Sequence, residues 1–135
     1  MTSVTVTRDQ LGSYIATNLA GAQLHFGEGE DDFSPVELLL VALAGCTGMD
    51  VDYLTSRRAE PDEFVIVADA ESVKDAVDGN VLADLTVTFR LRFPEGSDGD
   101  RARIALPAAI QRSHDRLCTV GRTIERPTAI GTHIE

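Results

Sequence analysis

The chain has 135 residues, of which 43% are hydrophobic and 25% charged, so we expect a single globular domain spanning residues 1–135. Its formal net charge of −10 would repel phosphate backbones and anionic lipid, which disfavours nucleic acid and membrane surfaces as partners. With no signal-like N-terminus and no apolar run long enough to span a bilayer, we expect a cytoplasmic protein.

The first quarter of the chain predicts three strands, over residues 3–8, 13–18 and 23–27. In the first of these, valines alternate with threonines, as in a half-buried strand. An acidic loop at residues 27–32 ends this strand-rich region.

A long helix is predicted next. Ser34 precedes Pro35, and Glu37 follows three residues after Ser34, which is the pattern of a capping box. The helix is expected to run to about Arg58, and residues 38–43 leave it no polar face for two turns. A helix that is apolar all round must be covered all round, and a single small chain can hardly do this. We therefore expect an obligate homodimer with this helix at its centre.

The second half predicts a strand over residues 64–70, a turn at 78–80 and a strand over 85–93. The last of these alternates clearly between apolar and polar side chains. Its apolar positions are Leu85, Val87, Phe89, Leu91 and Phe93.

Helical periodicity then covers residues 98–117, although Pro107 predicts a late start or a kink. A short irregular piece and a final strand at 129–134 complete the chain. The order of elements predicts an α+β protein with a mostly antiparallel sheet.

Cys46 lies in the middle of the apolar helix, where a thiol is either an inert core residue or a nucleophile shielded from water. Gly45 and Gly48 each cost a helix interior about 1 kcal/mol, which indicates close approach of another backbone or open space around the sulfur. Cys46 has no cation nearby on its own helix to activate it. An activating arginine would have to come from elsewhere, and the candidates are Arg8, Arg57, Arg122 or a partner subunit.

Cys118 follows His114 by about one helical turn. That histidine could assist proton transfer at the thiol, or it could simply be favoured by the dipole at the end of a helix. The three histidines show no metal-ligand spacing, and no nucleotide-binding or serine-hydrolase motif occurs. We therefore expect no metal and no cofactor.

The segment from Ser34 to Cys46 closely resembles the central-helix motif of the OsmC/Ohr family, and residues 114–120 resemble the family's second-cysteine region. The spacing of the cysteines and the chain length also fit. The resemblance implies an OsmC-like fold, in which two chains intertwine and their long helices pack between wrapped antiparallel sheets.

The resemblance also implies a thiol peroxidase that reduces organic hydroperoxides. Cys46 would be the peroxidatic residue, forming a sulfenic acid, and Cys118 the resolving residue, condensing with it to a disulfide. An external dithiol would restore both thiols by exchange. An apolar pocket around Cys46 would favour alkyl or lipid peroxides over hydrogen peroxide.

One position differs from the family's well-studied peroxidases. They carry a carboxylate directly after the helix proline, where this chain has Val36, and Glu37 stands one residue later. Their activating arginine comes from the N-terminal strands, where Arg8 is the candidate here. The sequence thus resembles the less characterised OsmC-like branch. Two alternatives remain open: a non-catalytic dimeric protein that binds a lipid-like ligand, and an enzyme of other thiol chemistry.

Overall fold

The computed structural model describes residues 1–135, which form two compact units, residues 1–40 and residues 41–135. In the first unit, β1 (Val4–Gln10), β2 (Ser13–Asn18) and β3 (Gln23–Gly27) make an antiparallel sheet in that order. The three strands expected in this part of the sequence are confirmed, although the first runs over residues 4–10 and not 3–8.

The N-terminal sheet has little of its own core. Tyr14 and Phe26 stack across β2 and β3 with ring centroids 5.8 Å apart. β1 is exposed along its whole length, so the half-buried character expected of it is not seen in the single chain. Gly27 allows close chain approach, because a Cβ there would stand 2.0 Å from the carbonyl oxygen of Gly12.

The long helix α1 (Pro35–Ser56) begins where the capping box predicts. The backbone N–H of Ser34 donates to Glu37 Oε1, and that of Glu37 donates to Ser34 Oγ, each over 3.1 Å. The helix ends two residues before the expected boundary at Arg58.

The apolar surface of α1 is only partly covered. Val41 is 50% exposed, Met49 63% and Tyr53 70%. By length and composition alone α1 could cross a membrane, but core helices of soluble proteins meet the same criterion. The predicted lack of a polar face on α1 thus has a visible consequence: large apolar side chains reach the surface of the single chain.

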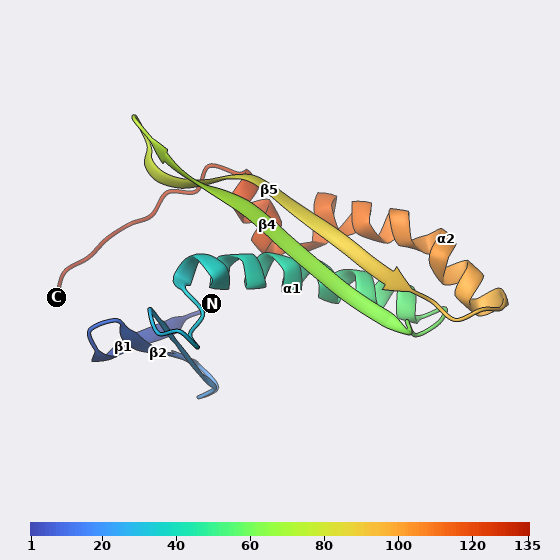
Figure 1. The fold of residues 1–135 in the computed structure, drawn as a ribbon, viewed down its shortest axis with the longest axis horizontal. Helices are drawn as coiled ribbons and strands as arrows, with labels where there is room; N and C mark the ends of the chain where they lie inside the picture. The colour runs from blue at the N-terminus through green and yellow to red at the C-terminus, as the bar shows by residue number, and fades with distance from the viewer. The chain divides into compact units, whose positions relative to one another are not determined.

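In the second unit, β4 (Glu63–Asp75) and β5 (Gly79–Arg92) form an antiparallel hairpin, which Figure 1 shows as a long ribbon lying across α1 and α2. The alternation predicted over residues 85–93 is confirmed, since the apolar side chains there are half-buried or buried and the threonines and arginines are exposed. Gly48 lets α1 approach β4 closely, because a Cβ there would lie 3.2 Å from Ile66 Cγ1.

The C-terminal helical region differs from the single helix expected over residues 98–117. It comprises α2 (Ser97–Arg112), one π-helical turn, η1 (Ser113–Leu117), and a third helix, α3 (Thr119–Glu125). Pro107 lies inside α2, and the late start that it predicted is wrong because the helix already begins at Ser97.

The helix α3 occupies the piece that the sequence indicated to be irregular, and its N-cap explains why it was missed. Cys118 leaves the helical conformation, with φ −71° and ψ 96°, and its Sγ accepts a hydrogen bond from the N–H of Gly121. Cysteine is not among the residues that normally signal a helix start.

The final strand expected at residues 129–134 is also wrong, since this segment forms no regular secondary structure. A strand requires a neighbour to pair with its backbone groups, and no strand of the chain pairs with it. Ile130 and Ile134 are fully solvated, at 92% and 97% exposure.

Candidate functional site

Two free thiols lie near each other where α1 passes the junction between η1 and α3. Cys46 lies close enough to Cys118 to raise the pKa of its thiol, although the two residues lie far apart in the sequence. Cys118 is 2% exposed, whereas Cys46 is only half-buried. The two residues named from the sequence are therefore brought together, and they differ in their access to solvent.

The surroundings of Cys118 keep its thiol protonated at neutral pH. Burial raises its pKa above the ordinary value of 9.0, the N–H of Gly121, which donates to Sγ over 3.3 Å, lowers it, and the neighbouring Cys46 and Asp50 raise it further. The net direction is upward. A buried thiol of this kind is a poor first nucleophile.

Three glycines shape the space around the sulfurs. A Cβ on Gly121 would lie 3.3 Å from Cys118 Sγ and 3.4 Å from Leu43 Cδ1, so this side is tightly packed. A Cβ on Gly45 would meet nothing within 4 Å. Of the two explanations given for the helix glycines, Gly48 fits the close approach of a neighbouring element, here β4. Gly45 fits the other, since the space at its own Cβ position is open.

A cavity of about 560 Å³ lies beside Cys118, between α1, β5 and the C-terminal helical segments. Its walls are mostly apolar, with a polar edge at His114 and Glu125. The apolar lining comprises Leu43, Leu85, Val87, Phe89, Ile110 and Ile124. The resemblance implied an apolar pocket around Cys46, and this cavity instead has Cys118 in its wall.

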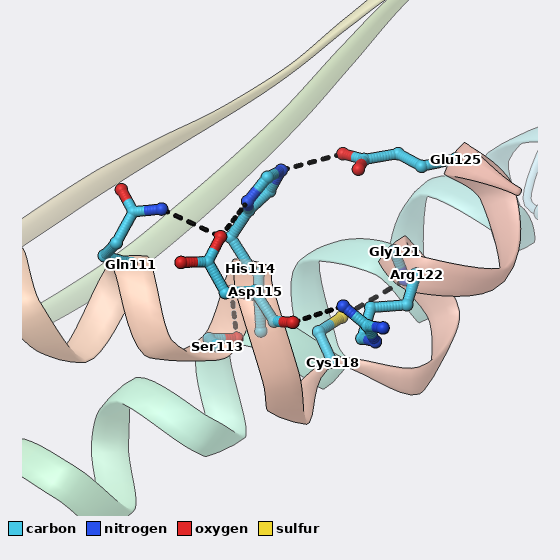
Figure 2. A network of polar contacts seen from close by, with 9 residues as sticks. Gln111, Ser113, His114, Asp115, Cys118, Gly121, Arg122 and Glu125 are labelled. Atoms are coloured by element: carbon cyan, nitrogen blue, oxygen red, sulfur yellow. Dashed lines mark hydrogen bonds and ion pairs between the residues drawn. The ribbon is translucent and has the colours of Figure 1, made fainter.

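The polar edge of the cavity is a network around His114, which Figure 2 shows from close by. His114 Nε2 lies 2.8 Å from Glu125 Oε1, and Nδ1 lies 3.0 Å from Asp115 Oδ1. The Gln111 amide donates to the same Asp115 oxygen over 2.9 Å. The two carboxylates, Asp115 first, raise the pKa of His114, while Gln111 and His114 lower that of Asp115.

Both ring nitrogens of His114 are thus engaged with carboxylates and neither with Cys118. The direct proton transfer to the thiol that sequence spacing suggested has no hydrogen bond to support it. His114 instead ties η1 to the far end of α3, through Glu125.

Sequence reasoning missed a second polar group, which is buried. Ser113 is fully buried, and its hydroxyl donates to Asp50 Oδ2 over 2.8 Å. Thr47 Oγ1 lies 2.8 Å from the same hydroxyl oxygen. Thr47 and Asp50 follow Cys46 on α1, and their polarity within so apolar a helix was the signal available in the sequence.

Within residues 41–135, neither Arg57 nor Arg122 forms a hydrogen bond to a thiol. Arg57 is exposed, and the Arg122 guanidinium donates to the carbonyl oxygen of Asp115. Glu37 and Arg8 belong to the N-terminal unit, where both are exposed and the Glu37 carboxylate caps α1. No group of three metal-ligating side chains is arranged to hold an ion.

Comparison with known proteins gives consistent results. The family model described as OsmC-like protein matches residues 27–133. An uncharacterized protein of Mycobacterium tuberculosis is 29% identical over 136 residues, which cover 99% of this chain and 96% of that protein.

Solved structures share the fold. An OsmC-like protein of unknown function from Vibrio cholerae superposes with a TM-score of 0.76 at 12% identity, covering 93% of this chain and 94% of that one. The organic hydroperoxide resistance protein OhrB of Bacillus subtilis gives a TM-score of 0.55 at 17% identity, covering 91% and 89%. From its family match and its fold, the chain belongs to the OsmC-like protein family.

Proposed function

We propose that this protein is a thiol-dependent peroxidase that reduces organic hydroperoxides to alcohols, with Cys46 as the attacking residue and Cys118 as the resolving residue. One observation carries the proposal: two reduced thiols are neighbours in the fold, one half-buried and the other buried in the wall of an apolar cavity. The family includes proteins named for organic hydroperoxide resistance, which supports the same chemistry.

The reaction begins with attack by the Cys46 thiolate on a peroxide oxygen. The O–O bond breaks, the sulfur is oxidised to sulfenic acid, and the alkoxide takes a proton and leaves as the alcohol. The Cys118 sulfur then attacks the sulfur of Cys46, and the S–O bond breaks. The proton lost by Cys118 leaves with the hydroxyl as water, and an external dithiol supplies two electrons to reduce the disulfide.

The difference between the two cysteines supports the proposed order of attack. Cys46 is half-buried and Cys118 almost fully buried, so Cys46 is the thiol that a peroxide reaches more easily. Cys118 is buried with a raised pKa, so its thiol remains protonated until a sulfenic acid forms next to it. The apolar side chains of the nearby cavity favour substrates with an alkyl body.

We further propose that the active form is a homodimer in the cytoplasm. A second copy would cover the apolar side chains that α1 leaves exposed, including Met49 and Tyr53. It would also offer a source of the activating cation, because no arginine in residues 41–135 forms a hydrogen bond to either thiol. We keep Arg8 as the predicted activating arginine and Glu37 as a predicted catalytic carboxylate. Sedimentation that finds a folded, stable monomer would contradict the dimer.

A second candidate function rests on the cavity itself. A volume of about 560 Å³ with mostly apolar walls suits a lipid-like ligand, and the protein could bind one without chemistry. In this case the thiols would be structural, and peroxide would leave them unchanged.

The test treats reduced protein with one equivalent of cumene hydroperoxide and maps the cysteines by mass spectrometry. We expect rapid formation of a Cys46–Cys118 disulfide in the unmodified chain and none in Cys46→Ser. In Cys118→Ser the sulfenic acid should persist on Cys46 and react with dimedone. Thiols that stay free for minutes in folded protein would overturn the peroxidase and leave the binding protein.

A further inference from the structure

The two sulfurs belong to separate parts of the unit, so some contact must hold those parts in register. Cys46 is on the regular helix α1, and Cys118 follows the π-helical turn η1. The first residue of this turn, Ser113, has no exposed surface. Every polar atom of a residue so buried needs a partner.

The contacts of Ser113 reach both cysteine-bearing segments. Its hydroxyl donates to Asp50 Oδ2 over 2.8 Å, and because that proton is committed, the Thr47 hydroxyl, 2.8 Å away, must be the donor to Ser113 Oγ. The Ser113 carbonyl oxygen accepts the N–H of Cys118 over 2.9 Å.

The α1 side of this arrangement is close to the other sulfur. Thr47 is the next residue after Cys46, and Asp50 lies one helical turn after it, on the same face. One serine is therefore bonded through its side chain to the neighbours of Cys46 and through its backbone to Cys118.

The π-helical turn explains how a single residue can do this. A π turn closes a wider backbone ring than an α turn, and such turns are frequent at functional sites. Here it brings the N–H of Cys118 onto the Ser113 carbonyl, and the chain leaves the helical conformation directly afterwards. An α-helical continuation would point the Cys118 side chain elsewhere.

We propose that Ser113, bonded to Thr47 and Asp50, is a positioning residue that sets the approach of the two sulfurs and thereby the ease of forming the Cys46–Cys118 disulfide. This rests on the proposed function for its biological meaning, but the approach of the sulfurs can be measured without peroxide. Ser113 acts through the two cysteines and takes no proton from either.

A matched control is present on the same helix. Thr55 is also fully buried, and its hydroxyl donates to the Val51 carbonyl oxygen over 2.9 Å. It has no bond to η1 or to either cysteine-bearing turn. Thr55→Val therefore removes a buried hydroxyl from α1 without touching the arrangement around Ser113.

The experiment equilibrates each variant with reduced and oxidised glutathione and measures the fraction of Cys46–Cys118 disulfide by mass spectrometry. In this exchange one oxidised glutathione accepts two electrons from the two thiols and leaves as two reduced glutathiones. The equilibrium gives the effective concentration of one thiol at the other. In parallel, circular dichroism and thermal melting establish that each variant is folded.

We expect Ser113→Ala to lower the effective concentration about five- to tenfold, as the loss of a buried hydrogen bond implies, and Thr55→Val to leave it unchanged. Thr47→Val should lower it, and Thr47→Ser, which keeps the hydroxyl, should restore it. The Thr47 pair decides the matter if Ser113→Ala does not fold.

An unchanged equilibrium in folded Ser113→Ala would overturn the proposal. If Ser113→Ala does not fold, an unchanged equilibrium in Thr47→Val would overturn it. A fall in Thr55→Val equal to that in Ser113→Ala would also overturn it. Failure of the peroxidase gives a different result. Cumene hydroperoxide would then leave Cys46 unoxidised, while the glutathione equilibrium would still report on the role of Ser113.

Discussion

The two cysteines are held by very different kinds of backbone. Cys46 lies well inside a regular helix of 22 residues that begins with a capping box. Cys118 lies at a break, after a π-helical turn of five residues and before a helix of seven residues. Its sulfur caps the start of that second helix. Short segments joined at a break open more easily than the middle of a long helix. The difference suggests a division of labour, in which α1 holds one sulfur still and the junction adjusts the other.

The largest test of this division removes the sulfurs in turn. Cys46→Ser should reduce hydroperoxide consumption by roughly three orders of magnitude or more, because the nucleophile is lost. Cys118→Ser should keep the first oxidation and lose only the disulfide. Stopped-flow peroxide consumption, over one turnover and over many, separates the two effects. Equal loss of the first turnover in both variants would contradict the assigned order.

The rigidity of the Cys46 segment can be tested at the two glycines beside it. Gly48→Val should destabilise the fold by about 2 kcal/mol, because its side chain would meet Ile66 and Phe64 on β4. Gly45→Ala, which has open space, should instead stabilise it by about 0.5–1 kcal/mol. Urea unfolding measures both. Similar effects of the two substitutions would mean that α1 is not fixed against β4 at this point.

The junction can be tested at its sulfur cap. Cys118→Ser retains an acceptor for the N–H of Gly121, whereas Cys118→Ala does not. Serine should therefore be the more stable variant by about 0.5–1 kcal/mol, the usual value of an N-cap. Thermal unfolding compares them directly, with hydrogen exchange of Gly121 as the local reading. Alanine equal to serine in both measurements would show that α3 does not depend on its cap.

The smallest effect is expected from pH. The pKa of His114 is raised by its carboxylate partners, so their bonds contribute stability in full below about pH 6.5 and lose it as pH rises through the folded-state pKa. The side chain is 59% exposed, so screening keeps the change in melting temperature to about one degree. His114→Gln should abolish this dependence between pH 6 and pH 9. A melting temperature that rises from pH 6 to pH 9 only when His114 is present would contradict the predicted direction of the pH dependence.

How far the sequence predicts the fold depends on whether a local rule applies. The start of α1 was predictable because Ser34 and Glu37 form a capping box, and the faces of β5 because apolar and polar residues alternate. The helix α3 was not, because a cysteine is an unusual cap and a π turn has no sequence signature. The strand at 129–134 failed because pairing, unlike helix formation, needs a neighbour that the single chain does not supply.

The candidate site was predictable in a similarly uneven way. Cys46 and Cys118 were singled out by composition and family resemblance, and the structure brings them together. Ser113 could not be foreseen, since its importance comes entirely from contacts with Thr47 and Asp50, which are distant in sequence. No periodicity in either segment encodes such a contact.

The sulfur cap of α3 has one more consequence, which follows from reciprocity. Cys118 Sγ is both the acceptor for Gly121 and the atom that would bond to Cys46. Two equilibria that share an atom are coupled, and each shifts the other by the same free energy. If the thiol is the better cap, conditions that order α3 hold the pair reduced, and conditions that fray it favour oxidation. The helix content of residues 119–125 would then report whether the cysteine pair is reduced or oxidised.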